Sequence, residues 1–284
     1  MKISILSSAY ILRHTLEESI EKASEAGYDA IDFFASYPHA EPRVIDKKSR
    51  EKLRILADQH GLAINQIASY GNPTTGFFAE MEGYVTAQIE RLEFAKDVGA
   101  HHVELVPGFT RPDLPKELTW KWAVEGHKRI AEYGEKIGIP IAIEFEPVQP
   151  NQEMWGRPMP PNVYDLKSLK RFIDDVGGNC QANLDIGHCN IVAKGHPESV
   201  KDDLLALRGC IIGVHCNDND GISDLNLVPG RGTCDFSYYI NLLNEMGYDR
   251  YVGIELEGED NPIPAARESI KLIKDIMVKI NAYK

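Results

Sequence analysis

One local pattern recurs seven times along the 284 residues: an amphipathic run ends, a glycine follows, and a short apolar segment begins. Glycine takes the left-handed conformation that ends a helix at no steric cost, so each repeat predicts a helix followed by a strand. With the apolar segment at residues 2–6, the pattern predicts eight strands. The seven glycines are Gly27, Gly61, Gly99, Gly138, Gly177, Gly209 and Gly247.

Helical periodicity fills the segments between these strands, and Thr15 and Glu18 have the spacing of a capping box at the start of the first helix. The expected helices span residues 16–26, 47–60, 81–98, 120–137, 166–176, 199–207, 236–246 and 264–280. Strands that alternate with helices form a parallel sheet, so the pattern predicts a single (β/α)8 TIM barrel over residues 1–284. The alternative, a doubly wound sheet, would need a glycine-rich phosphate loop after the first strand, where the sequence reads SSAY.

Charge and composition exclude several classes of function. The formal net charge of −12 opposes nucleic-acid binding, which usually requires a basic face. The sequence shows neither a signal peptide nor an apolar run long enough to cross a membrane, so we expect a cytoplasmic protein without a membrane partner. The five cysteines are odd in number and form no CxxC pair, which predicts reduced thiols rather than disulfides or a zinc site.

The apolar segment that follows Gly138 ends in two carboxylates, Glu144 and Glu146. Because side chains alternate along a strand, both carboxylates point to the same face. A buried carboxylate without a partner costs several kcal/mol or more, so something must compensate it. A divalent cation is the first candidate.

The ends of the next three strands carry further candidate ligands. In a TIM barrel, functional side chains lie at the carboxyl ends of the strands. Asp185 ends the sixth strand, His215 the seventh, and Glu255 and Glu257 the eighth. Each alone could be structural, but together with Glu144 they predict a metal site. The mixed oxygen and nitrogen ligands suit Mn²⁺, Co²⁺, Mg²⁺ or Zn²⁺, and the carboxylate majority favours Mn²⁺.

Several motifs resemble those of the sugar phosphate isomerase/epimerase family, which has a xylose isomerase-like TIM barrel. They are LDIGH at 184–188, VHCND at 214–218, PGRG at 229–232, and GYD at 247–249 followed by GIE at 253–255. The resemblance spans nearly the whole chain. It implies that Glu144, Asp185, His215 and Glu255 hold a divalent metal ion and that His188 contacts substrate hydroxyls. It also implies a homo-oligomer.

The expected activity is isomerisation or epimerisation of a sugar, keto-sugar or inosose. The metal ion would chelate a carbonyl and the adjacent hydroxyl, which stabilises the enediolate formed by deprotonation. Glu144 and Glu255 would take and return the proton. His188, Glu146 and Glu257 would bind hydroxyls. The family's ketose epimerases carry an arginine where this chain has Gly221, so the substrate stays open.

Other residues could complete the substrate site. Trp155, Phe33 and Phe109 could cover the apolar faces of a sugar ring, although each is also an ordinary packing residue. Trp155 lies in a long loop at 148–162, which we interpret as an active-site lid without secondary structure. Arg231 could hold a phosphate or carboxylate, but few other basic residues converge there, which favours a non-phosphorylated carbohydrate or cyclitol substrate.

Three other functions remain as alternatives. A lyase or dehydratase would use the same enolate to expel a leaving group. A DNA-repair nuclease shares the barrel, but it uses a histidine-rich three-zinc cluster that this chain does not match. A non-catalytic assembly role would not require all four ligand types. His101 and His102 enter at the opposite end of the barrel and are read as structural, whereas Glu104 could reach the site.

Overall fold

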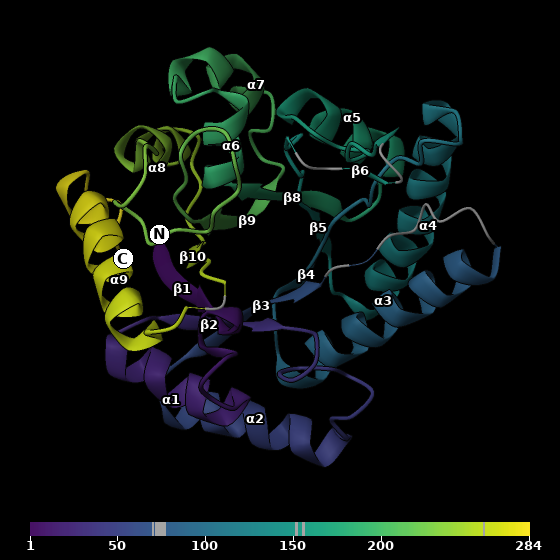
Figure 1. Cartoon of the computed structure of the whole chain (residues 1–284). Coiled ribbons are helices and arrows are strands. Elements are labelled where there is room, and N and C mark those ends of the chain that lie inside the picture. The colour runs from purple at the N-terminus through teal and green to yellow at the C-terminus, as the bar shows by residue number, and fades with distance from the viewer. Residues whose placement is uncertain (70, 72–77, 151–152, 155–156, 258) are drawn as a thin grey trace.

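Eight parallel strands close into a barrel in the computed structural model, which describes residues 1–284 except 70, 72–77, 151–152, 155–156 and 258 (Figure 1). Around the barrel the strands lie in the order β1-β10-β9-β8-β5-β4-β3-β2. The strands are β1 (Lys2–Leu6), β2 (Ala30–Phe34), β3 (Ala63–Ser69), β4 (His102–Leu105), β5 (Ile141–Ile143), β8 (Cys180–Asp185), β9 (Ile211–Cys216) and β10 (Tyr251–Ile254). The predicted (β/α)8 barrel is confirmed.

Helices surround the barrel and bury their apolar faces against the outside of the strands (Figure 1). They are α1 (Leu16–Ala26), α2 (Lys47–Gln59), α3 (Phe78–Val98), α4 (Lys116–Ile137), α5 (Leu166–Val176), α6 (Ile186–Val192), α7 (Lys201–Leu205), α8 (Phe236–Glu245) and α9 (Pro262–Lys279). All seven glycines predicted to end helices have positive φ, and the capping box of Thr15 and Glu18 is formed.

Two helical predictions need correction. The helix expected at 199–207 is a 3-10 turn, Pro197–Val200, followed by the five-residue α7. The short helix α6, directly after β8, was not expected, because its seven residues carry too little periodicity to be recognised. None of the helices in the described part of the chain is long and apolar enough to cross a membrane.

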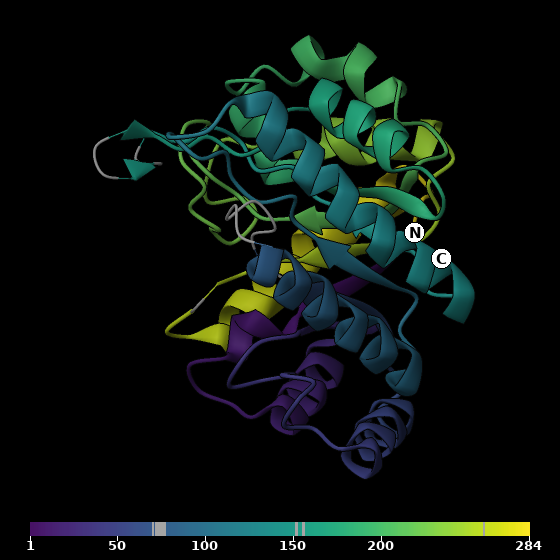
Figure 2. The ribbon, with the colours of Figure 1, turned by 90° about the vertical axis from the view of Figure 1, so that its right-hand side faces the viewer.

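The loop after β5 contains secondary structure that the sequence prediction missed. Strands β6 (Glu153–Met154) and β7 (Arg157–Pro158) pair antiparallel, and the hairpin projects away from the barrel (Figure 2). The prediction of a structureless segment at 148–162 is therefore wrong. Two-residue strands are too short to show alternation in sequence, which explains the miss. Trp155 lies outside the described residues.

The inside of the barrel is unusually polar. TIM barrels are normally filled by branched apolar side chains, but here Asp32, Gln66, His102 and Asn183 are all buried. Asp32 is hydrogen-bonded to Ser4, His102 to Gln66, and Asn183 to Glu144. Gly213 of β9 makes room for them. A Cβ atom there would overlap Asn183 Oδ1 and lie 2.8 Å from His102 Nε2.

We predict that Gly213→Ala destabilises the protein by about 1–3 kcal/mol, because the added methyl group overpacks this interior. The control is Gly83→Ala in α3, where a Cβ would meet nothing within 4 Å. That helix position should instead gain about 0.5–1 kcal/mol. Urea unfolding of both variants measures the free energies. Equal effects of the two substitutions would contradict the packing argument.

Candidate metal centre

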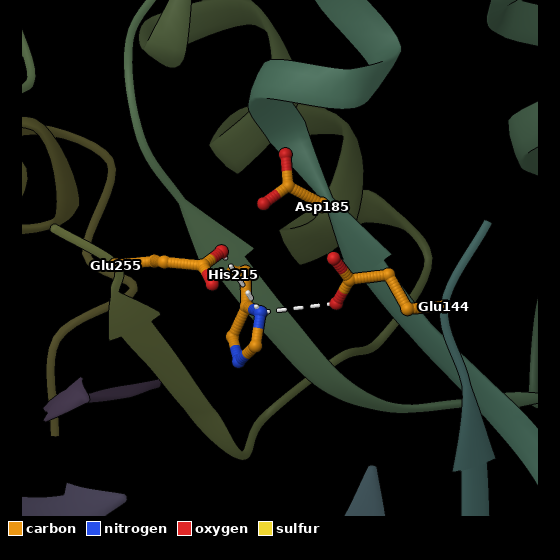
Figure 3. Close-up of side chains that lie close together, drawn as sticks. All are labelled: Glu144, Asp185, His215 and Glu255. Carbon is orange, nitrogen blue, oxygen red and sulfur yellow. Dashed lines mark ion pairs between the residues drawn. The ribbon is translucent and has the colours of Figure 1, made fainter. Parts of the chain in front are cut away.

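Four neighbouring strands bring Glu144, Asp185, His215 and Glu255 together at the carboxyl end of the barrel (Figure 3). Glu144 directly follows β5 and Glu255 directly follows β10, while Asp185 ends β8 and His215 lies opposite it in β9. One potential ligand atom from each residue lies within 4.8 Å of the others. All four residues are at most 3% exposed.

His215 lies between two carboxylates. Its Nδ1 atom is 3.0 Å from Glu144 Oε2 and 3.2 Å from Glu255 Oε2. Despite this proximity, Nδ1 makes no hydrogen bond of good geometry among the described residues. A buried ring nitrogen that faces carboxylate oxygens in this way is suited to share a cation with them.

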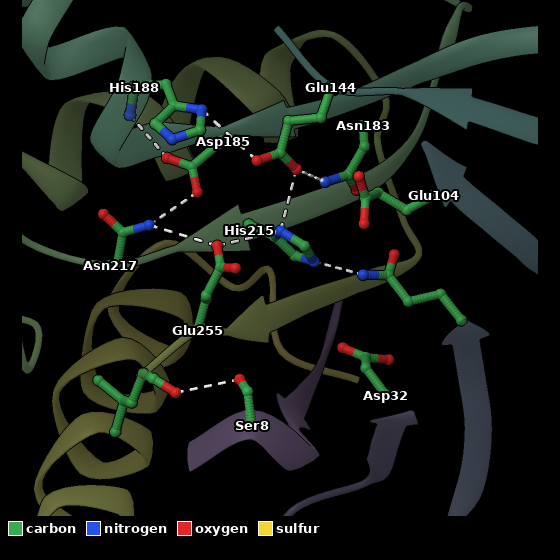
Figure 4. A network of polar contacts seen from close by, with 12 residues as sticks. Ser8, Asp32, Glu104, Glu144, Asn183, Asp185, His188, His215, Asn217 and Glu255 are labelled. Carbon is green, nitrogen blue, oxygen red and sulfur yellow. Dashed lines mark hydrogen bonds and ion pairs between the residues drawn. The ribbon is translucent and has the colours of Figure 1, made fainter. Parts of the chain in front are cut away.

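Carboxamide side chains hold the four candidate ligands in place (Figure 4). Asn183 donates to Glu144, and Asn217 donates to Asp185 Oδ2 at 2.8 Å and to Glu255 Oε2 at 3.4 Å. The amide nitrogen of Gln66 contacts His215 Nε2. Partners of this kind orient metal ligands and tune their affinity.

Asp185 also places His188. As the N-cap residue of α6, Asp185 accepts a hydrogen bond from the backbone N–H of His188 at 2.6 Å. The imidazole of His188 contacts the carbonyl oxygen of Phe145 through Nδ1 at 2.8 Å and Asp224 through Nε2 at 3.3 Å. Its Nδ1 also lies 3.4 Å from Glu144 Oε1. The histidine is thus fixed beside the four-residue cluster.

Burial and mutual repulsion shift the pKa values of the carboxyl groups apart. Burial, together with Glu144 and Glu255, raises the pKa of Asp185 well above its usual range. Burial also opposes ionisation of Glu255, but His215 outweighs it and lowers the pKa of Glu255 to about 2. Burial raises the pKa of Glu146 to about 7. So many buried acidic groups favour a compensating cation.

The cluster opens into a small cavity of about 260 Å³. The described residues that line it are Glu144, Glu146, His188, Asp224, Asn226, Glu255 and Glu257. Glu146 and Glu257 face the same cavity as Glu144 and Glu255, but their side chains are more exposed. No lysine or arginine is among these described lining residues.

Sequence reasoning missed several of these residues. Asn183 and Gln66 are in strands, and alternation with Asp185 would have placed Asn183 on the inner face. Asn217 lies inside the VHCND motif at 214–218, but the motif alone indicated no role for it. Asp224 and Asn226 come from the loop after β9, where no periodicity indicates which side chains return to the cavity.

Arg231 points away from the cavity. Its guanidinium pairs with Glu268 of α9 at 2.5 Å, and both side chains are about half exposed. The backbone amides of this motif bind the chain's own carboxylate: Asp218 accepts from the N–H groups of Gly230 and Gly232 at 2.8 Å each. These hydrogen bonds fix the loop that contains Gly230 and Gly232 to Asp218. The proposed role of Arg231 in binding substrate stays a prediction.

The remaining candidates lie in different surroundings. His102, read from sequence as structural, is fully buried inside the barrel, and its Nε2 lies 2.8 Å from Gln66 Oε1. His101 is exposed and packs near Tyr251. Phe33 is fully buried and packs against Phe94 of α3 at 6.4 Å between ring centroids. Phe109 forms an isolated bridge with Pro161.

The donor set fits a divalent cation. Three carboxylates and one imidazole at this spacing suit a first-row divalent ion or Mg²⁺, and the unsatisfied Nδ1 atom of His215 faces the shared centre. The amides of Asn183 and Asn217 donate hydrogen bonds to Glu144 and Asp185, which orients the carboxylates without adding a positive charge.

Comparison with known proteins agrees with this fold. The sequence matches the family of xylose isomerase-like TIM barrels over residues 20–276. The chain belongs to this family. Among curated relatives, fructoselysine 3-epimerase of Escherichia coli O157:H7 is 23% identical over 253 residues, which cover 86% of each chain.

Two solved structures superpose on this chain over nearly its full length. A D-tagatose 3-epimerase-like protein has a TM-score of 0.80 at 24% identity, covering 99% of this chain and 98% of that one. The IOLI protein, solved with a bound zinc atom, also has a TM-score of 0.80, at 20% identity and with 98% and 99% coverage. At these identities the likeness shows the shared fold.

We predict that Glu104→Gln changes the pH dependence of stability. Burial, with repulsion from Glu144, raises the pKa of Glu104 well above its usual 4.5, so the folded chain keeps this proton while the unfolded chain loses it. The stabilising contribution of Glu104 is therefore complete below about pH 4.5 and is lost as the pH rises. Relative to wild type, Glu104→Gln should gain up to about 1.4 kcal/mol per pH unit above pH 5.

Urea unfolding in EDTA at pH 4.5 and pH 7.5 measures this difference. The exposed Glu132→Gln in α4 is the matched control and should show the same offset from wild type at both pH values. A pH-independent offset for Glu104→Gln would show that Glu104 is ionised in the folded protein.

Proposed function

We propose that this protein is a divalent-metal-dependent isomerase or epimerase of a sugar, keto-sugar or inosose. The observation that carries the proposal is the buried cluster of Glu144, Asp185, His215 and Glu255 at the mouth of the barrel. Membership of a family whose relatives include fructoselysine 3-epimerase and inosose isomerase supports the same reaction class.

A divalent cation in this cluster would stabilise negative charge on the carbonyl oxygen and adjacent hydroxyl of a hydroxyketone. The protein's own task is to move the proton on the neighbouring carbon. Glu144 and Glu255 come from strands on either side of the cluster, so one carboxylate removes the proton and the other returns it to the opposite face. Asn183 and Asn217 keep both carboxylates in position.

The outer cavity is suited to the hydroxyl groups of an uncharged substrate. His188, Glu146 and Glu257 would bind hydroxyls, as expected from sequence, and Asp224 and Asn226 extend the same wall. Because the described lining offers several carboxylates and neither lysine nor arginine, it disfavours a phosphate group. We therefore propose a non-phosphorylated carbohydrate or cyclitol.

The carboxylate-rich donor set favours Mn²⁺, with Mg²⁺, Co²⁺ and Zn²⁺ as alternatives. The structurally similar IOLI protein was solved with a bound zinc atom, which supports a divalent metal ion in this site. The homo-oligomer and the cytoplasmic location stay predictions.

A lyase is the second candidate, because deprotonation at the same carbon also precedes loss of a leaving group. The two outcomes differ in the product. In D₂O an isomerase or epimerase introduces solvent deuterium without loss of mass, whereas a lyase releases water or an aglycone.

The first prediction of this proposal concerns metal removal. Protein stripped with EDTA should lose turnover on a panel of ketoses and inososes, because the substrate carbonyl then lacks the Lewis acid that polarises it. Re-addition of Mn²⁺ should restore turnover. Mass spectrometry and NMR of products formed in D₂O identify the reaction class. Full activity of the stripped protein would contradict the proposal.

A second prediction separates the two carboxylates that follow β5. Glu144→Gln should abolish metal binding and turnover, because Glu144 belongs to the buried cluster. Glu146→Gln should mainly raise KM, since Glu146 lies on the outer wall of the cavity. Steady-state kinetics and metal titration of both variants provide the readout. The reverse assignment would show that Glu146 is the ligand.

A further inference from the structure

Gln66 joins the candidate ligand His215 to a second buried imidazole. The ring of His215 presents Nδ1 to the carboxylates of the cluster (Figure 4). Its Nε2 contacts the amide of Gln66 inside the barrel. The other end of the same amide, Oε1, lies 2.8 Å from His102 Nε2. All three side chains are at most 1% exposed, so solvent does not compete for these contacts.

The tautomer of His215 decides whether its Nδ1 atom can bind a cation. A neutral imidazole has one N–H group and one lone pair, and a metal ion requires the lone pair. If Nδ1 is the ligand, the proton must lie on Nε2. That N–H would point at the amide group of Gln66, and the oxygen of this amide can accept its hydrogen bond.

The amide of Gln66 can satisfy His215 in two ways, because its oxygen and nitrogen have nearly the same size and position. With the nitrogen toward His215, as in the structure, the amide donates to Nε2, and the proton of His215 lies on Nδ1. With the amide turned by half a rotation, its oxygen accepts from Nε2–H, and the Nδ1 lone pair is free.

The second arrangement also changes His102. Burial lowers the pKa of His102 to about 3, so this ring is neutral and carries one proton. When the amide nitrogen of Gln66 points to His102 Nε2, that nitrogen must accept, and the His102 proton lies on Nδ1. For a neutral His215, each arrangement leaves one proton on each ring, so rotation of the amide moves protons between ring nitrogens without gain or loss.

We propose that Gln66 and His102 are positioning residues that set the tautomer of His215 and so prepare its Nδ1 atom for a divalent cation. This inference rests on the metal site proposed above. Hydrogen-bond partners of metal-ligating histidines typically contribute about 10–100-fold to metal affinity. A purely space-filling Gln66 would contribute to stability and not to the tautomer.

The test uses the full chain and Zn²⁺, a diamagnetic probe. Gln66→Leu should weaken Zn²⁺ binding by about 10–100-fold in competition with a chelator, because Nε2–H then lacks its acceptor. Gln66→Glu should stay close to wild type, since a carboxylate accepts from both rings. The matched control is Gln88→Leu, which removes an equally buried glutamine whose partner is Ser69. It should lose stability and keep the wild-type affinity.

Histidine tautomers provide a second readout, which is independent of metal affinity. In two-bond ¹H–¹⁵N spectra of ¹⁵N-histidine-labelled wild type, Zn²⁺ should move the proton of His102 from Nε2 to Nδ1, although His102 is not a ligand. The same shift should be absent in Gln66→Leu.

The outcomes separate the two proposals. If wild type binds Zn²⁺ through His215 while Gln66→Leu keeps that affinity and His102 does not change tautomer, the role of Gln66 and His102 is overturned and the metal site stands. If wild type binds no Zn²⁺ through His215, the metal site and this inference both fail.

Discussion

Repulsion among buried carboxylates is the constraint on which the rest of the site depends. Glu104, Glu144, Asp185 and Glu255 are all at most 3% exposed and lie near the imidazole of His215. Burying one ionised carboxylate costs several kcal/mol unless it is paired. Protonation relieves part of this cost at Glu104 and Asp185, whose pKa values are raised, and a divalent cation would relieve the rest.

Neutral amide side chains orient the candidate ligands. Asn183, Asn217 and Gln66 hold the ligands through amides, which orient a carboxylate or imidazole without neutralising it. An arginine or lysine in the same positions would compete with a metal ion. The polar barrel interior and the missing side chain at Gly213 therefore serve the site, at the expense of the apolar packing usual in this fold.

The fold could be predicted from sequence because a glycine marks seven helix-to-strand connections and most strands are short and largely apolar. The four clustered side chains could be predicted because strand ends in a closed barrel converge on one point. What the sequence could not show was the support of the site. Gln66 acts across the barrel from β3 to β9, a contact between residues 149 positions apart, and Asp224 returns to the cavity from an irregular loop. The pairing of Arg231 with Glu268 was not visible in the sequence either, since it depends on the position of α9.

The measurement that tests the central claim most directly is an anomalous difference map from a crystal of the protein soaked in Mn²⁺. The account predicts one strong peak within coordination distance of Glu144, Asp185, Glu255 and the Nδ1 atom of His215. A map without a peak among these four residues, or with its main peak at another site, would contradict it.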